Sequence, residues 1–408
     1  MQYKIALTSA ALLIGAVQAQ NSTSDVPSSC SIEAGATAVA QADLDKYSKC
    51  EKLVGDLLIS GTADRMSLAN VQEIDGSLTV NNATKLVSFS ADSLQSISKS
   101  LNLRGLTVLE KASFGSLEEV SEIDFTTLPA VSNIITKLKS ADKLIISDTN
   151  LESIDGFESL QSIQILNINN NKALATIRSQ LKSVSNALDV SFNGRQSNVT
   201  FDNLQWANNI TMRDVNSVSL KSLEKVNSSM SFLETSLEEL KISNLTSVGG
   251  TLTVTGNDDL SEVDFPSLTG VSGALVVANN SNLEQINGFS NVQTVGNALI
   301  ISGKFNSLDL DNLKSIKGGA QVETTSSNFT CDALKALQKA GGIQGDTFVC
   351  KNGASSTSMQ LGSGGSGTAS GQSTASSTDG AKSSGIAANF APGSSFMGAV
   401  AAVAVALL

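Results

Sequence analysis

A short apolar motif that recurs along the middle of the chain limits the possible folds more than any other feature. The motif is an apolar residue, a residue of any kind and a second apolar residue, as in residues 78–80 (Leu-Thr-Val) and 252–254 (Leu-Thr-Val). Twelve copies follow one another at intervals of 20 to 24 residues. A unit of this length is too small to bury an apolar face alone, so the repeat predicts a solenoid of stacked units. The copies begin at Leu57, Leu78, Leu101, Ile123, Leu144, Leu166, Leu188, Ile210, Met230, Leu252, Leu275 and Leu299.

Two solenoid architectures fit this period, a leucine-rich repeat with helices and a single-chain parallel β-helix. The segments between the motifs are short and rich in Ser, Thr, Asn and Gly, and β-branched residues are abundant throughout. Both features favour strands over helices. We therefore predict an all-β fold, a parallel β-helix of about 12 coils over residues 51–330, with neighbouring strands about 4.8 Å apart.

Four asparagines support this registration of the coils. Each lies three residues after the second apolar position of its motif. Asparagine tolerates the left-handed backbone conformation and can hydrogen-bond to nearby backbone. We expect these residues to stack as a structural ladder and give them no functional role. They are Asn171, Asn193, Asn257 and Asn280.

The chain has four cysteines, in two close pairs at the two ends of the repeat region: Cys30, Cys50, Cys331 and Cys350. Three connectivities are open, and local pairing would close short loops and suit caps on the exposed strand edges of the end coils. Zinc is a weaker alternative, because thiols in an oxidising compartment tend to pair. We predict an N-terminal cap over residues 20–50, helical at 41–47, and a C-terminal cap over residues 331–352, which opens with a short helix.

Both termini carry processing signals. Residues 1–19 read as a secretory signal peptide, with one lysine, an apolar stretch and small residues before the cleavage point. The last 13 residues are apolar or small and too few to span a bilayer. Small residues and a spacer precede them. This order predicts that residues 386–408 are a GPI signal, which is removed when the lipid is attached. The alternative interpretation of the same residues is a weak tail anchor. The attachment candidates are Ser383, Ser384 and Gly385, with Gly380, Ala381 and Asn389 as other positions.

Two further features suit a secreted surface protein. Residues 353–385 consist mostly of Ser, Thr and Gly, so they predict a disordered stalk that cannot bury enough apolar area to become ordered. Eight sequons of the form Asn-x-Ser/Thr predict N-glycans on the surface. They lie at Asn21, Asn82, Asn198, Asn209, Asn227, Asn244, Asn279 and Asn328.

The sequence offers little for catalysis. It contains no histidine, and its formal net charge of −11 disfavours nucleic acid as a partner. On the outward position of the predicted strands the only carboxylates are Asp124 and Asp189. They lie three coils apart, about 14 Å, which is too far for the carboxyl pair of a glycosidase.

The acidic pairs at 118–119 and 258–259 lack the further oxygen ligands that calcium needs. Trp206 stands alone and is expected to be partly buried beside Ile210. We therefore predict no catalytic, metal or cofactor site.

The parts of the chain, taken together, resemble a known family. Cysteine-flanked coils that read IDGSLTV (74–80), VGGTLTV (248–254) and VSGALVV (271–277), with the signal peptide, sequons, stalk and GPI signal, look like the fungal GPI-anchored cell-wall organisation proteins. That family is related to the receptor L-domain, the ligand-binding β-helix of insulin- and EGF-type receptors. The resemblance implies a non-enzymatic role in cell-wall organisation and integrity. The protein would lie on the outer face of the plasma membrane, with possible transfer to the wall.

The same resemblance implies partners among wall polysaccharides or wall-building proteins, and it carries no catalytic motif to transfer. Two other functions stay open. One is a β-helix enzyme that acts on polysaccharide, and the other is a receptor-like ectodomain that captures a soluble ligand.

Overall fold

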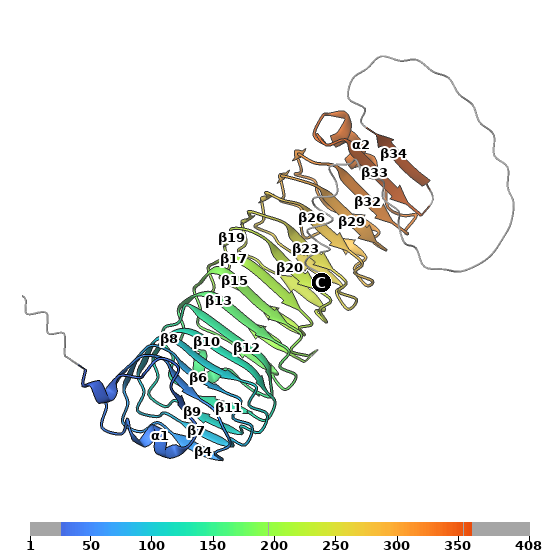
Figure 1. Ribbon diagram of the computed structural model, residues 1–408. Helices are drawn as coiled ribbons and strands as arrows, with labels where there is room; N and C mark the ends of the chain where they lie inside the picture. The colour runs from blue at the N-terminus through green and yellow to red at the C-terminus, as the bar shows by residue number, and fades with distance from the viewer. Residues whose placement is uncertain (1–25, 195, 354, 361–408) are drawn as a thin grey trace, which may run out of the picture.

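The computed structural model describes residues 26–194, 196–353 and 355–360 of the chain. These residues form one long rod of stacked coils, blue at its N-terminal end and orange-red at its C-terminal end (Figure 1). The rod is a parallel β-solenoid of about 13 turns, with 42% strand and 6% helix. The predicted parallel β-helix is therefore confirmed. The predicted signal peptide (1–19), Asn21, the GPI signal (386–408) and its attachment candidates lie outside the described residues.

One continuous sheet runs the length of the rod, and we call it the main sheet. Each of its strands pairs in parallel with the strand one coil earlier and one coil later; for example, Leu78 of one coil lies opposite Leu57 and Leu101 of its neighbours. The twelve motifs all lie in this sheet. Its strands, in stacking order, are β1 (Thr37–Ala38), β3 (Leu57–Ile59), β6 (Leu78–Asn81), β8 (Ser96–Arg104), β10 (Glu119–Leu128), β12 (Lys143–Thr149), β13 (Ser162–Asn169), β15 (Ser183–Ser191), β17 (Trp206–Arg213), β20 (Met230–Leu233), β23 (Leu252–Thr255), β26 (Leu275–Ala278), β29 (Leu299–Gly303), β32 (Ala320–Thr324) and β33 (Thr347–Asn352).

A second row of short strands precedes the main strands in most coils; the coils of β12 and β33 have only isolated bridges in this row, at Ser140 and Ile343. In β8, β10, β13, β15 and β17 the second-row and main strands are continuous. In β8, β10, β13 and β15 a shift of register separates the two parts. Such a shift adds residues to one strand and bends it, so the chain turns a corner without leaving the ladder. The separate strands of this row are β2 (Lys52–Val54), β5 (Glu73–Asp75), β19 (Lys225–Val226), β22 (Ser247–Val248), β25 (Gly270–Val271), β28 (Thr294–Val295) and β31 (Ser315–Ile316).

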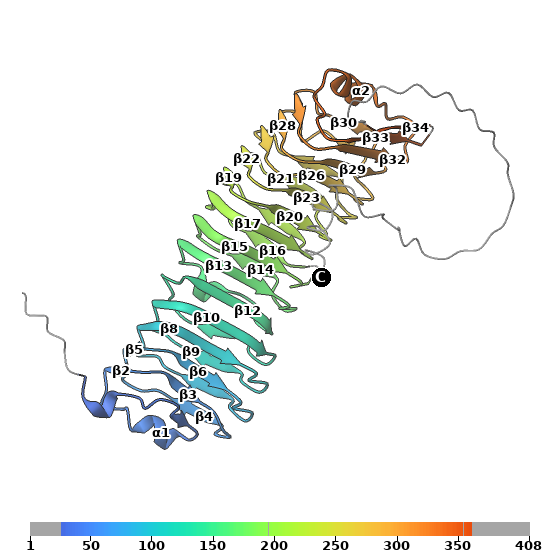
Figure 2. The same ribbon diagram turned by 45° about the horizontal axis from the view of Figure 1, so that its top comes forward.

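A third row closes the cross-section and is interrupted in several places. The first interruption holds the short helix η2 (Asp155–Phe157), which lies between β11 and β14 in the chain. Figure 2 shows the rod from a second direction, with β14 and β16 of this row in view. The strands of the third row are β4 (Arg65–Ser67), β7 (Ser88–Ser90), β9 (Lys111–Ser113), β11 (Asn133–Ile135), β14 (Thr176–Arg178), β16 (Asn198–Thr200), β18 (Ser217–Ser219), β21 (Glu239–Lys241), β24 (Glu262–Asp264), β27 (Gln285–Ile286) and β30 (Ser307–Leu308).

The core is a single apolar cluster that runs inside the coils from Cys30 to Cys350. Because the coils are in register, like residues stack on like residues. The rings of Phe89 and Phe114 lie 5.8 Å apart, and those of Phe265 and Phe289 lie 5.4 Å apart. Burial of each large apolar side chain stabilises the fold by about 1.5–3 kcal/mol, and every coil contributes several of them.

A row of left-handed residues forms the corner that follows the main strands. At most coils this corner passes through a residue with φ between 51° and 70°. Only glycine adopts this conformation readily, and asparagine and aspartate tolerate it better than other residues do. The row contains Asn82, Gly105, Thr127, Asp148, Asn170, Phe192, Asp214, Glu234, Gly256 and Asn279.

The predicted asparagine ladder is present, but left-handed tolerance is not its cause. In each case the left-handed residue is the one before the ladder asparagine, such as Gly256 before Asn257. The Asn257 side chain instead points into the coil. Its amide donates to the carbonyl oxygens of Phe232 and of the Asn280 side chain, and its oxygen accepts from the backbone and hydroxyl of Thr235. Asn171 repeats these contacts with its own neighbouring coils.

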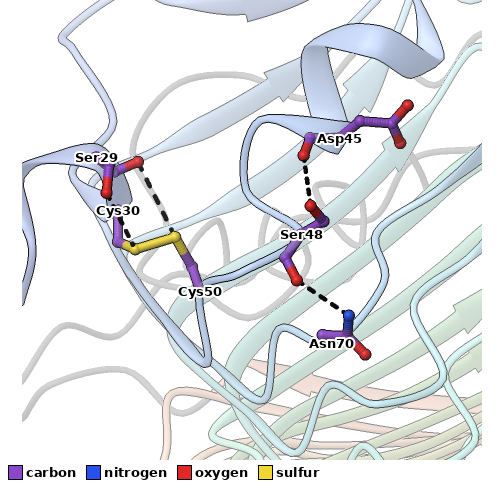
Figure 3. Close-up of a disulfide and its surroundings, with 6 residues drawn as sticks. All are labelled: Ser29, Cys30, Asp45, Ser48, Cys50 and Asn70. Atoms are coloured by element: carbon purple, nitrogen blue, oxygen red, sulfur yellow. Dashed lines mark hydrogen bonds between the residues drawn. A yellow bond between two sulfur atoms is a disulfide. The ribbon is translucent and has the colours of Figure 1, made fainter.

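Disulfides hold both ends of the rod. The cysteines pair locally, Cys30 with Cys50 and Cys331 with Cys350. Figure 3 shows the first pair, with the neighbouring hydrogen bond from the Asn70 amide to the carbonyl of Ser48. The N-terminal end contains η1 (Ser28–Cys30) and α1 (Gln41–Asp45), which is shorter than the expected 41–47, and the C-terminal end contains α2 (Asp332–Lys339).

The first turn of α1 is stabilised by a charge. The Asp43 carboxylate accepts hydrogen bonds from the backbone of Val39 and Ala40 and pairs with Lys46 at 2.8 Å. The Lys46 contact, followed by the two backbone donors, lowers the pKa of Asp43 to about 2. The carboxylate thus satisfies backbone groups that a helix start leaves without partners.

Near the C-terminal end, the structure contains two strands that the repeat did not predict. The coil of β32 was missed because Ala320 stands where the other motifs have a large apolar residue. Beyond it, β34 (Ser355–Gln360) pairs antiparallel with β33, within the segment predicted to be stalk from residue 353 onward. A strand edge exposes unpaired backbone groups, and a short neighbouring segment can satisfy them whatever its composition.

We expect replacement of Asn257 by alanine to destabilise the rod strongly. The change leaves the backbone groups of Phe232 and Thr235 buried and without partners, at about 1–3 kcal/mol each, so a loss of about 3 kcal/mol is expected. Urea denaturation followed by circular dichroism measures it. Asn297→Ala, on the exposed surface, is the matched control; equal midpoints for the two variants would contradict the ladder's role.

Candidate functional site

The two outward aspartates of the main sheet do not form a catalytic pair. Asp124 lies opposite Ile145, which lies opposite Asn167, which lies opposite Asp189. Three coil steps therefore separate the carboxylates, about 14 Å at the usual spacing of strands. Glycoside hydrolysis requires a closer pair.

Each of these aspartates is engaged by its neighbours. Asp124 forms an ion pair with Arg104 at 2.5 Å and accepts from the hydroxyl of Thr126. Asp189 accepts a hydrogen bond from the hydroxyl of Ser191. Burial raises the pKa of Asp189, and the Ser191 hydrogen bond and the charge of Arg213 oppose this shift in part. The two residues therefore belong to the packing of the sheet surface.

The remaining acidic residues form no metal site within the described part of the chain. No group of three or more His, Cys, Asp or Glu residues there could hold a metal ion. The acidic pairs at 118–119 and 258–259 are exposed or pair with basic residues, as Glu118 does with Lys139 at 2.7 Å. Among the described helices, none is long and apolar enough to cross a bilayer.

Trp206 faces outward at the start of a main strand. It stands at the start of β17 with 36% of its surface accessible, and the next residue, Ala207, is the one that points into the coil. Partial burial was expected, and about one third of the side chain is exposed. Unbroken alternation from Ile210 would turn Trp206 inward as well, but the shift of register between the two parts of the β15–β17 pairing turns Ala207 inward instead.

The outward face of the main sheet carries a connected set of polar side chains in its middle coils. The Asn102 amide donates to the hydroxyls of Thr79 and Ser100. Further along, the hydroxyl of Ser147 donates to Asn169, whose amide donates to Asn167. The apolar motif marks only the outward position between its two apolar residues. The second outward column, two residues further along each strand, was missed, although the alternation of a strand implies it.

Phe192 is the most unusual side chain of this region. It follows β15 at the left-handed corner, with φ 57°, and 44% of its surface is exposed. A bulky residue in this conformation is rare and costly. The guanidinium of Arg213 lies 5.1 Å from the ring centre, and the same side chain pairs with Glu234 at 3.1 Å. Within the described residues, the buried Nε of Arg213 makes no hydrogen bond.

Seven of the eight sequons lie in the described part of the chain. Five asparagines are exposed: Asn82, Asn227, Asn244, Asn279 and Asn328. The other two are half-buried, and their side chains hydrogen-bond to neighbouring coils; the Asn209 oxygen accepts from the backbone of Ser229, and the Asn198 oxygen accepts from the hydroxyl of Ser217. The fold therefore leaves room for a glycan at the five exposed positions.

These observations define a class: an elongated, disulfide-capped β-solenoid whose described residues form no catalytic or metal constellation. Comparison with known proteins shows which family within this class the chain belongs to. The chain is 52% identical to the cell wall mannoprotein PST1 of Saccharomyces cerevisiae over 324 residues, 79% of this chain and 73% of the relative. It is 34% identical to the cell surface GPI-anchored protein ECM33 of Candida albicans over 350 residues, 85% of this chain and 84% of the relative.

A third relative, the protein ecm33 of Aspergillus fumigatus, is 30% identical over 341 residues, 83% of this chain and 84% of its own. The chain therefore belongs to this family of fungal cell-wall and GPI-anchored cell-surface proteins. No family model matches the chain. No solved structure matches it.

Replacement of Asp189 by asparagine is expected to stabilise the rod at neutral pH. The folded protein binds the Asp189 proton more tightly than the unfolded chain does, so the charged carboxylate costs stability once the pH rises above the unfolded pKa of about 3.8 and through the raised folded pKa. Asparagine keeps an oxygen that accepts from Ser191 and carries no charge.

The change also creates a sequon at residues 189–191, so both proteins are produced without N-glycans, in the bacterial periplasm. Their thermal unfolding at pH 7 and at pH 3 measures the effect. The variant should melt at a higher temperature at pH 7, and the difference should shrink at pH 3, where both side chains are neutral. A difference of the same size at both pH values would show that burial of the charge is not its cause.

Proposed function

We propose that this protein is a non-enzymatic, GPI-anchored glycoprotein of the fungal cell surface that acts in the organisation and integrity of the cell wall. The observation that carries this proposal is its 52% identity to a cell wall mannoprotein over 79% of the chain. The second relative's printed name, a GPI-anchored cell-surface protein, supports the location. The protein would stand on the outer face of the plasma membrane, with transfer to the wall as a further step.

The architecture suits a scaffold better than an enzyme. The main sheet and the apolar core run without a break through all the coils, so the molecule is stiff along its axis. The outward surface of the main sheet is extended, and its outward carboxylates are too far apart for glycoside cleavage. Such a rod can contact wall polysaccharide or wall-building proteins at several points along its length, which we propose as its partners.

We also propose the processing of the chain. Residues 1–19 are removed on secretion and residues 386–408 on attachment of the lipid, at Ser383, Ser384 or Gly385. The Ser/Thr/Gly-rich segment up to residue 385 holds the rod away from the membrane. The eight sequons carry N-glycans, most readily at the five exposed asparagines.

Saccharomyces cerevisiae cells that lack the matching cell wall mannoprotein test the wall function. The full chain should restore growth on dyes that perturb the wall, because the anchored rod supplies the missing scaffold. A chain that ends at residue 385 should be secreted into the medium and should fail to restore growth. Full rescue by this free form would contradict a role at the surface, and release of oligosaccharides from β-glucan, chitin or mannan by the purified protein would contradict the non-enzymatic role.

Digestion of intact cells tests the anchor and the glycans. Phosphatidylinositol phospholipase C should release the membrane-bound protein, because the lipid is its only predicted attachment. An N-glycosidase should then lower the apparent mass of the released protein by several glycans. Retention on membranes from which a known GPI-anchored control is released would count against the anchor, and an unchanged mass would remove the argument from the sequons.

A further inference from the structure

The longest interval between successive sequons runs from Asn82 to Asn198. Between Asn82 and Asn198 the sequence contains no Asn-x-Ser/Thr, and this interval includes β8, β10, β12, β13 and β15 of the main sheet. Along the main sheet, Asn82 follows β6 on one side of this interval and Asn209 lies in β17 on the other, whereas Asn198 lies in the third row. We call the outward surface of these five strands the sequon-free face. If Asn82 and Asn209 carry glycans, this is the longest part of the main sheet that stays bare.

The sequon-free face offers a repeating set of hydrogen-bonding groups. Asn102, Asp124, Asn167 and Asp189 occupy the same outward position on four of its five strands, and Ile145 occupies it on the fifth. One such group recurs about every 4.8 Å along the axis. Within the described residues, the Asn167 amide nitrogen and the Asn102 oxygen make no hydrogen bond. They therefore retain a donor and an acceptor for a ligand.

Phe192 places an exposed ring at the end of β15, at the edge of this face. Other coils place polar residues or glycine at the same corner, such as Asn170 and Asp148. Asparagine would adopt φ 57° at less cost and would lose no core contact, since the ring lies outside the coil. The exposed ring at this corner is therefore a candidate surface for a ligand. Aromatic faces stack on the apolar faces of pyranose rings, and the Arg213 contact fixes the orientation of this ring.

We propose that the sequon-free face binds a neutral, β-linked polysaccharide that lies along the axis of the rod, with Phe192 as the stacking platform and Asn102 and Asn167 as hydrogen-bonding residues. A polymer of identical sugars suits a surface whose polar groups repeat once per coil. A neutral polymer is favoured over a charged one because Asp124 already forms an ion pair with Arg104, so its charge does not select a charged ligand. This inference rests on the proposed wall function, because it names the wall component that the rod contacts.

A protein partner is less well supported by the same surface. Stable protein interfaces have a buried apolar centre with aromatic or arginine anchors. On the central outward column of the sequon-free face, Ile145 is the one apolar residue, and the exposed Phe192 lies at the edge and not at the centre. The sequon-free face is polar and repetitive and has no apolar anchor at its centre, so it lacks the features of a protein-binding hot spot.

A glycan placed on the face tests the proposal directly. Asn169→Thr creates a sequon that begins at Asn167, so that a glycan on Asn167 would cover the centre of the face. Binding of the secreted glycoprotein to insoluble β-1,3-glucan and to chitin is measured by sedimentation, in separate arms that distinguish the two β-linked polymers. We expect the parent protein to bind at least one, and the glycosylated variant to lose that binding.

Two variants serve as matched controls. Asn169→Val has the shape of threonine and creates no sequon, so it separates the glycan from the loss of the Asn169 side chain; it should retain most of the binding. Ile135→Thr creates a sequon at Asn133, on the third row of strands in the same part of the rod, and should bind like the parent. Mass spectrometry confirms occupancy of both new sites.

Phe192→Asn gives an independent test. Asparagine suits the left-handed corner, so the melting temperature should stay equal or rise, while binding to the polysaccharide should weaken about tenfold from the loss of one aromatic stacking contact. Unchanged binding in this variant and in glycosylated Asn169→Thr would overturn the proposal, as would failure of the parent to bind either polymer. Rescue of wall-defective cells by the parent protein is measured separately. The proposed wall function is therefore tested independently of the proposed polysaccharide-binding face.

Discussion

The stacking of coils in register is the interaction on which the rest of the structure depends. Each main strand pairs with the equivalent strand of the next coil, so the backbone hydrogen bonds run along the axis of the rod. This register places apolar residue over apolar residue in the core and asparagine over asparagine at the corner. It also fixes what faces outward. A slip of one residue would turn the core outward in every coil beyond it.

The period of the apolar motifs was enough to predict this arrangement. All twelve predicted cores lie in the main sheet, because an alternating pattern with a constant spacing leaves few other ways to bury its apolar face. The coil of β32 escaped notice because alanine is too common to mark a strand. The asparagine ladder followed from position alone, although its cause proved to be the buried hydrogen bonds of Asn257 and Asn171 and not their backbone conformation.

The surface was harder to predict than the core. Nothing local in the sequence marks Phe192 as exposed, since a phenylalanine beside a strand is usually buried. Its exposure becomes visible only when the corner residues of all the coils are aligned and it stands among polar residues and glycine. The same alignment reveals the second outward column of the main sheet. The register between coils determines which side chains lie together on the surface. The sequence of a single coil does not show which residues of other coils lie beside its own.

The fact that each coil contacts only its neighbours along the axis has an evolutionary consequence. Removal or duplication of one whole coil would leave every remaining interface with a partner of the same kind, and the disulfide-bonded ends would be untouched. Each such event would change the height of the rod by about 4.8 Å. The length of the rod is thus a quantity that this architecture can adjust in small, heritable steps while the fold stays the same.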